Sequence, residues 1–130
     1  MIDPPILKRF VQVAWQRYSL DGCPGFDWQN PPEPADLEML LADFSDAERY
    51  QGLEDLAVLI SQQFLSSRFD FPFADKLINL IHCNISPFDG PERLNRIYLA
   101  FDAGELGPRD DKDPVAEFTI PLLREILEDF

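Results

Sequence analysis

Apolar side chains recur every three or four positions along most of this chain, and a proline, a glycine or a capping residue interrupts each run. The clearest run spans four turns and consists of Tyr50, Leu53, Leu56, Ala57, Ile60 and Phe64. This spacing is that of an α-helix with one apolar face, whereas a half-buried strand alternates every second residue. The pattern therefore predicts a series of amphipathic helices.

Capping residues mark where these helices begin. The first, over residues 4–19, follows Asp3 and opens with prolines, which the first turn of a helix tolerates. Ser45 and Glu48 match the capping box, in which the two side chains reciprocally satisfy unpaired backbone amides, so a helix is expected from residue 46. Further helices are expected from residue 34, over 72–84, from the Asp89 cap to Gly104, and from residue 114 behind Asp113.

The segment around residue 70 also resembles a strand. Phe69, Phe71 and Phe73 alternate with polar residues or proline. Pro72 and the apolar stripe that follows favour a helix instead, because proline cannot donate to a sheet ladder.

Pro121 interrupts the last helical segment. An internal proline removes one backbone hydrogen bond and crowds the preceding turn. Either the helix kinks there, or Thr119 caps a second short helix that begins at Ile120. The apolar set of the whole segment is Phe118, Leu122, Leu123, Ile126 and Leu127.

Five or six helices without a convincing strand predict an all-α fold, a single-domain bundle over residues 1–130. No run of about 18 apolar residues is present, which is the length a membrane span requires. The first residues lack a basic segment followed by an apolar stretch, so no signal peptide is expected. A cytoplasmic location follows as an expectation.

The charge is strongly acidic. The chain has 24 Asp and Glu against 11 Lys and Arg, a formal net charge of −13. Such a chain repels phosphate groups, so neither nucleic acid nor an anionic membrane is an expected partner. A basic protein is the favoured partner.

Few residues are candidates for catalysis or metal binding. His82 and Cys83 are neighbours on a predicted helix and point about 100° apart, which disfavours a nucleophilic pair. Cys23 and Cys83 are expected to be reduced thiols, and with a single histidine they cannot form a zinc site without carboxylates. We therefore expect no enzyme activity, no cofactor and no metal.

A cluster of aspartates near residue 111 supplies the hard oxygen ligands that Ca²⁺ and Mg²⁺ prefer. Asp110, Asp111 and Asp113 do not follow the spacing of a calcium-binding loop. A solvated hinge, in which Arg109 and Lys112 balance the charge, is the favoured interpretation.

A run of carboxylates without a base follows directly on Phe26 and Trp28. The run consists of Glu33, Asp36, Glu38, Asp43, Asp46 and Glu48. Protein interfaces combine apolar anchors with a charged rim, although such a run is also typical of a solvated helix face. Phe26 and Trp28 either fill a gap between helix ends or face a partner, and burial of at least one is favoured because an exposed pair promotes aggregation.

In its length, its predicted helices and its run EPADLEMLLADFSDAE, the chain resembles the small acidic immunity proteins with which bacteria neutralise their own toxins. The resemblance implies a cytoplasmic inhibitor that binds a basic, nuclease-type toxin domain and blocks or covers its active site. From the charge pattern we expect the carboxylates to meet Lys or Arg side chains that would otherwise hold phosphates. The predicted partner-binding residues are Asp36, Glu38, Asp43, Asp46 and Glu48, with Trp28 and a second patch of Asp110, Asp111 and Asp113.

Two other classes of function remain open. A small helical enzyme or metal-binding domain would use clustered carboxylates and His82, and would bind a divalent ion. An adaptor subunit of a larger assembly would expose an apolar patch and self-associate.

Overall fold

The computed structural model describes residues 4–21, 32–42, 44–82, 92–105 and 113–129. Within these ranges it contains six α-helices, one π-helical turn and no strand, which confirms the predicted all-α fold of five to six helices. The helices are α1 (Pro4–Asp21), α2 (Pro34–Leu41), α3 (Asp46–Leu65), α4 (Phe71–His82), α5 (Glu92–Gly104) and α6 (Ile120–Asp129), and the π-helical turn η1 (Val115–Thr119) leads directly into α6.

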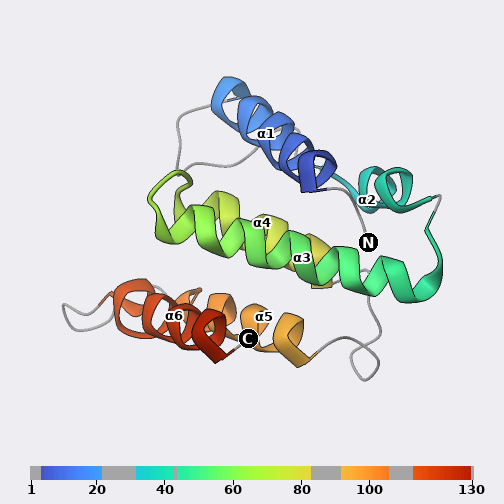
Figure 1. Ribbon diagram of the computed structural model, residues 1–130. Helices are drawn as coiled ribbons and strands as arrows, with labels where there is room; N and C mark the ends of the chain where they lie inside the picture. Colours follow the sequence, from blue (N-terminus) through green and yellow to red (C-terminus); the bar gives the residue numbers. More distant parts are fainter. Residues whose placement is uncertain (1–3, 22–31, 43, 83–91, 106–112, 130) are drawn as a thin grey trace.

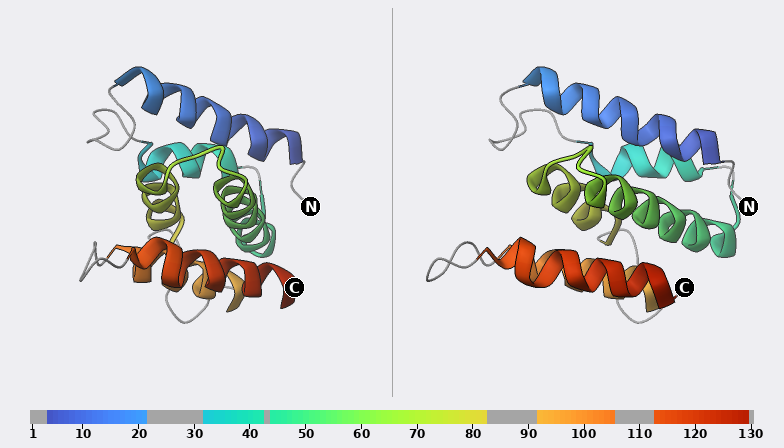
Figure 2. Two further views of the ribbon diagram at one scale, coloured as in Figure 1. Left: turned by 90° about the vertical axis from the view of Figure 1, so that its left-hand side faces the viewer. Right: turned by 60° about the vertical axis from the view of Figure 1, so that its left-hand side comes forward.

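The helices are arranged in three layers (Figures 1 and 2). The first outer layer contains α1 and α2, the middle layer contains α3 and α4 side by side, and the second outer layer contains α5 with η1 and α6. All six helices contribute side chains to one cluster of buried apolar residues. As a result, α1 and α6 lie on opposite sides of the middle layer.

The start of α3 is where the Ser45 and Glu48 pattern predicts it. Ser45 Oγ accepts a hydrogen bond from the Glu48 backbone N–H at 3.4 Å and donates one to Glu48 Oε1 at 3.2 Å. The serine therefore satisfies one of the amides that a helix leaves unpaired at its N-terminus.

Asp70 caps α4 and joins it to α1. Its Oδ1 accepts a hydrogen bond from the Phe73 backbone N–H at 2.9 Å, and its Oδ2 accepts one from the Tyr18 hydroxyl at 2.9 Å. Phe69 is buried just before the helix, with its ring centroid 4.7 Å from that of Phe73. The alternating phenylalanines thus lead into a helix, as predicted, and the helix begins at Phe71.

The chain passes Pro121 by way of η1. The Ile120 N–H donates to the Val115 carbonyl, the five-residue spacing of a π-helix. This wider turn stands where the proline ring would crowd the carbonyl four residues earlier in a regular α-helix. A new α-helix does begin at Ile120, but Thr119 does not cap it, because its buried hydroxyl donates to the Ala100 carbonyl of α5 at 2.8 Å.

The π-helical turn divides the apolar set expected for this segment. Leu123 and Ile126 are buried, whereas Phe118 is 48% exposed and Leu122 is 39% exposed. Because a π turn holds an extra residue, it changes the angular positions of the residues before α6 relative to those within it. The outer face of η1 and α6 therefore carries two large apolar side chains that the sequence pattern assigned to the same set as the core residues.

Candidate functional site

Four carboxylates of the predicted binding run are described: Glu33 precedes α2, Asp36 and Glu38 lie on α2, and Glu48 lies in the first turn of α3. We call this set, Glu33, Asp36, Glu38 and Glu48, the acidic corner. Glu33, Glu38 and Glu48 are exposed and Asp36 is half-buried. Asp43 and the side chain of Asp46 lie outside the described part of the chain.

Helix starts hold two of these carboxylates in place. Asp36 Oδ2 accepts a hydrogen bond from the Glu33 backbone N–H at 2.8 Å, in the first turn of α2. Glu48 lies in the first turn of α3 and is bonded to Ser45. The N-terminus of a helix carries partial positive charge, which attracts nearby carboxylates. The acidic corner is therefore a set of fixed negative charges.

One cation balances part of this charge. Arg49 of α3 forms an ion pair with Glu38 of α2, and this contact ties the two helices together. This ion pair offsets one of the four negative charges of the acidic corner.

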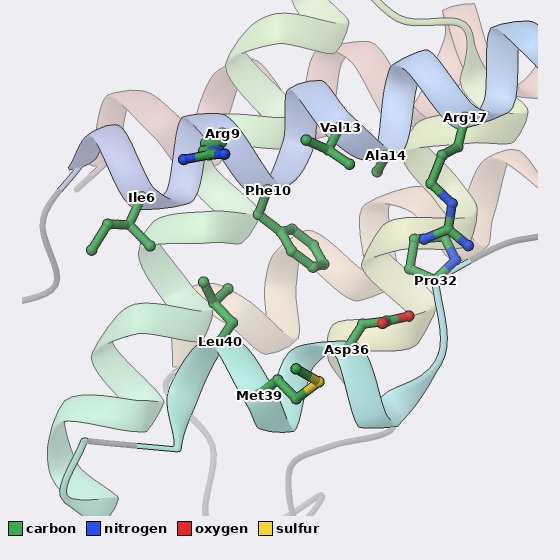
Figure 3. A pocket seen from close by; sticks show the side chains of 10 residues that line it. All are labelled: Ile6, Arg9, Phe10, Val13, Ala14, Arg17, Pro32, Asp36, Met39 and Leu40. Carbon is green, nitrogen blue, oxygen red and sulfur yellow. The ribbon is translucent and has the colours of Figure 1, made fainter.

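A groove adjoins the acidic corner between α1 and α2 (Figure 3). It has a volume of about 460 Å³, and Asp36 belongs to its wall. Figure 3 shows the apolar side chains of α1 facing those of α2, with Arg17 reaching from α1 towards Pro32. The residues that line this α1–α2 groove are Ile6, Arg9, Phe10, Val13, Ala14, Arg17, Pro32, Asp36, Met39 and Leu40.

The groove is apolar and accessible at its edges. Ile6 is 43% exposed, Val13 45% and Met39 79%. Methionine is common at adaptable binding surfaces, because its flexible side chain fits partners of different shape. The groove is therefore an open apolar surface rather than an enclosed cavity.

The second predicted patch is described only at Asp113. This residue is exposed, and its Oδ1 accepts a hydrogen bond from the Val115 backbone N–H at 3.0 Å, so it caps the segment that leads into η1, as predicted. Asp110 and Asp111 lie outside the described residues, as do Phe26 and Trp28.

Of the residues considered for catalysis, His82 is described and the two cysteines are not. The His82 ring stacks on Tyr98, with centroids 3.6 Å apart and planes inclined by 6°. Among the described residues, no group of three or more His, Cys, Asp or Glu side chains is placed to hold a metal ion. Within the same residues, none of the helices combines the length and the apolar character needed to cross a bilayer.

The structure also reveals a carboxyl pair that the sequence does not indicate. Asp75 of α4 is hydrogen-bonded to Glu105, which follows α5, and its Oδ1 is buried without a partner among the described atoms. Burial, together with the bond to Glu105 and the charges of Glu105 and Asp102, raises the pKa of Asp75 to about 8. Burial also tends to raise the pKa of Glu105, but hydrogen bonds with Asp75, Asn79 and Asp102 outweigh it and lower that pKa. At neutral pH, Asp75 therefore keeps its proton, and its carboxyl O–H donates a hydrogen bond to the ionised Glu105.

One signal for the groove is present in the sequence. The apolar residues of α1 cover more than one face, because Ile6, Phe10 and Val13 lie beside the buried stripe that includes Leu7 and Val11. A helix whose apolar arc is wider than its contact with the core has a surface left for another element. No comparable signal marks Asp75, whose neighbours come from a different helix.

Comparisons with protein families, with curated proteins and with solved structures find no match for this chain.

Proposed function

We propose that this protein is an acidic binding protein that neutralises a basic protein partner, and that it acts as an immunity protein against a nuclease-type bacterial toxin. The acidic corner is the observation that carries the proposal. Three of its four carboxylates are exposed, helix starts hold Asp36 and Glu48, and Glu38 forms an ion pair with Arg49.

Fixed charges suit the recognition of a basic surface. A nuclease holds its substrate with Lys and Arg side chains, and carboxylates at the acidic corner meet the same groups through charge-assisted hydrogen bonds. Because Asp36 and Glu48 are already held by backbone or side-chain contacts, little conformational freedom is lost when a partner binds. The excess negative charge also speeds the encounter with a cationic partner.

The proposed role requires no catalytic group in this chain. The partner is disabled when its cationic side chains are occupied or covered, so the described contacts of His82 and Asp75 belong to the folded scaffold. The surplus of acidic residues over the whole chain, −13 in net charge, supports the same kind of partner.

Reversing the charge of the acidic corner should slow association. The Glu33→Lys/Glu38→Lys variant is expected to bind the toxin domain at least about tenfold more slowly at low salt, because steering charges act mainly on the association rate. Stopped-flow mixing with a basic nuclease-type toxin domain, sought first among exported proteins that adjoining genes encode, measures this rate. Co-expression of the two chains gives a second measurement, since the wild-type protein should restore growth of cells that produce the toxin domain.

The matched control changes the net charge equally at other sites. Glu92 on α5 and Glu128 on α6 are exposed, and the Glu92→Lys/Glu128→Lys variant is expected to slow association less than about threefold. If both variants slow association equally, the overall charge of the chain rather than the acidic corner determines the association rate. An unchanged rate in the Glu33→Lys/Glu38→Lys variant would remove the acidic corner from the interface.

A further inference from the structure

Large apolar side chains are exposed at two separate places in the described residues. Three of them, Ile6, Val13 and Met39, line the α1–α2 groove, and two, Phe118 and Leu122, lie on η1 and α6. These two surfaces hold five of the six large apolar side chains that are exposed in the described part of the chain. Exposed apolar surface of this kind marks interaction sites.

The two surfaces differ in their prevailing charge, although each also carries one charge of the other sign, Asp36 in the groove and the exposed Arg124 on α6. In a chain of net charge −13, α1 has three basic residues, Lys8, Arg9 and Arg17, and no carboxylate before Asp21. Arg9 and Arg17 both line the groove. On the other surface, Glu117 of η1 and Glu125 of α6 are exposed beside Phe118 and Leu122.

The spacing of these charges also matches. Arg9 and Arg17 are eight positions apart, and so are Glu117 and Glu125. At the α-helical rise of 1.5 Å per residue, the eight positions from Arg9 to Arg17 extend about 12 Å. Glu117 lies in the π-helical turn, so the separation of Glu117 and Glu125 is similar but not identical. In each case the large apolar side chains lie between the two charges, Phe10 and Val13 in the groove and Phe118 and Leu122 on the other surface.

A single copy cannot bring the two surfaces together, because the α3 and α4 layer separates α1 from α6 (Figures 1 and 2). We propose that the α1–α2 groove of one copy binds the outer face of η1 and α6 of a second copy. In this contact Phe118 and Leu122 enter the groove, and Glu117 and Glu125 pair with Arg9 and Arg17. The inference goes beyond the proposed function, which uses the acidic corner, and does not depend on it.

The contact joins two different surfaces, and every copy has both. A copy that is bound through one surface can therefore bind a further copy through the other. Such a head-to-tail contact produces a chain or a closed ring rather than a symmetric dimer. Repulsion between copies of net charge −13 opposes it at low ionic strength, and salt screens this repulsion over distances beyond about 8 Å at physiological concentration. Self-association should therefore strengthen when salt is added, whereas binding of a basic partner should weaken.

Sedimentation velocity and light scattering of the purified full chain test the contact. At physiological salt, the weight-average mass is expected to rise at least about twofold between about 20 µM and about 1 mM, as for a weak interface. It should continue past the mass of a dimer, and it should fall when salt is reduced. A wild-type chain that stays monomeric throughout this range would overturn the proposal.

Two variants separate the surfaces. An Arg9→Glu/Val13→Glu variant blocks the groove, and a Phe118→Ser/Leu122→Ser variant blocks the outer face; both change exposed residues, and circular dichroism checks their fold. Each variant alone is expected to stay monomeric. A mixture of the two retains one intact groove and one intact outer face, so it should form a 1:1 dimer and stop there.

Leu99 provides the matched control. It is 61% exposed on α5, outside both surfaces, and the Leu99→Ser variant should associate like the wild-type chain. Equal loss of association in this variant would mean that general surface hydrophobicity drives it. Undiminished association of either blocked variant, or a mixture that stays monomeric, would also overturn the proposed contact.

Discussion

Replacement of Gly104 by alanine is expected to lower the free energy of unfolding by about 2 kcal/mol. Gly104 ends α5 where η1 and α4 come close, and a Cβ atom at this position would lie 2.9 Å from Cε2 and Cζ of Phe71 and would overlap Oγ1 of Thr119. The better helix propensity of alanine offsets at most about 1 kcal/mol of this cost. Urea denaturation of the two proteins measures the difference.

The two neighbours cannot easily give way. The Thr119 hydroxyl is held by its hydrogen bond to the Ala100 carbonyl, and the Phe71 ring packs against Phe64 and Phe101, with centroids 6.1 Å and 5.9 Å away. A Gly104→Ala/Phe71→Leu double variant removes part of the crowding and should recover part of the lost stability, so that the two changes are not additive. If the Gly104→Ala variant is as stable as the wild type, η1 packs less closely on α5 than the distances around Gly104 indicate.

Gly104 also illustrates where a sequence is informative and where it is not. The sequence correctly places the end of a helix at this residue, because glycine is common at helix ends. The structure shows a different reason for it: Gly104 does not adopt the left-handed conformation, and its lack of a side chain permits the close approach of Thr119 and Phe71. Gly104 approaches residues that lie 15 and 33 positions away in the sequence, and a local sequence pattern does not reveal such contacts.

The helices themselves could be predicted because their signals are local. Ser45 identifies the start of α3, Asp113 caps the segment before η1, and the stripe from Tyr50 to Phe64 follows one helix face. The π-helical turn could not be predicted in this way. It is accompanied by a hydrogen bond from the Thr119 hydroxyl to the Ala100 carbonyl, and this bond joins two separate helical segments. For the same reason, Phe118 and Leu122 were grouped with buried residues although they are exposed.

The candidate site was predictable in part. The run of carboxylates is a sequence feature, and the structure places its described members around the starts of α2 and α3. The pairing of Glu38 with Arg49 and the groove beside Asp36 depend on how α1, α2 and α3 pack, and the run alone does not contain that information. Charge thus predicted the candidate surface, and only tertiary structure showed the apolar groove beside it.

The Asp75→Asn variant is expected to be more stable than the wild-type chain at pH 8, by about 1–2 kcal/mol once solvent screening of this half-buried site is allowed for. Asparagine donates a hydrogen bond to Glu105 without a titrating proton and has nearly the same shape as aspartic acid. In the wild type, the folded protein holds the Asp75 proton up to a pKa of about 8, whereas the unfolded chain releases it near the ordinary pKa of 3.8. Folding therefore takes up a proton between these two values.

The sign of the pH dependence follows from this uptake. The contribution of Asp75 to stability is greatest at low pH, declines as the pH rises from about 4 to about 8, and is constant above that. Glu105, whose pKa is lowered, contributes in the opposite sense, because its stabilisation is present above its ordinary pKa of 4.5 and is lost below it. Between pH 5 and pH 8, the difference between the two proteins therefore reports mainly on Asp75.

Thermal and urea denaturation at pH 5, 6.5 and 8 measure this difference. The advantage of Asp75→Asn should grow with each step in pH. A Glu105→Gln variant provides the control, because it removes the charge that helps to raise the pKa of Asp75 while the burial remains. The pH dependence of its stability should therefore be reduced without being abolished. If the stability difference between Asp75→Asn and the wild type is the same at all three pH values, Asp75 is ionised in the folded protein. The close approach of α4 to the end of α5 would then be maintained without a proton between Asp75 and Glu105.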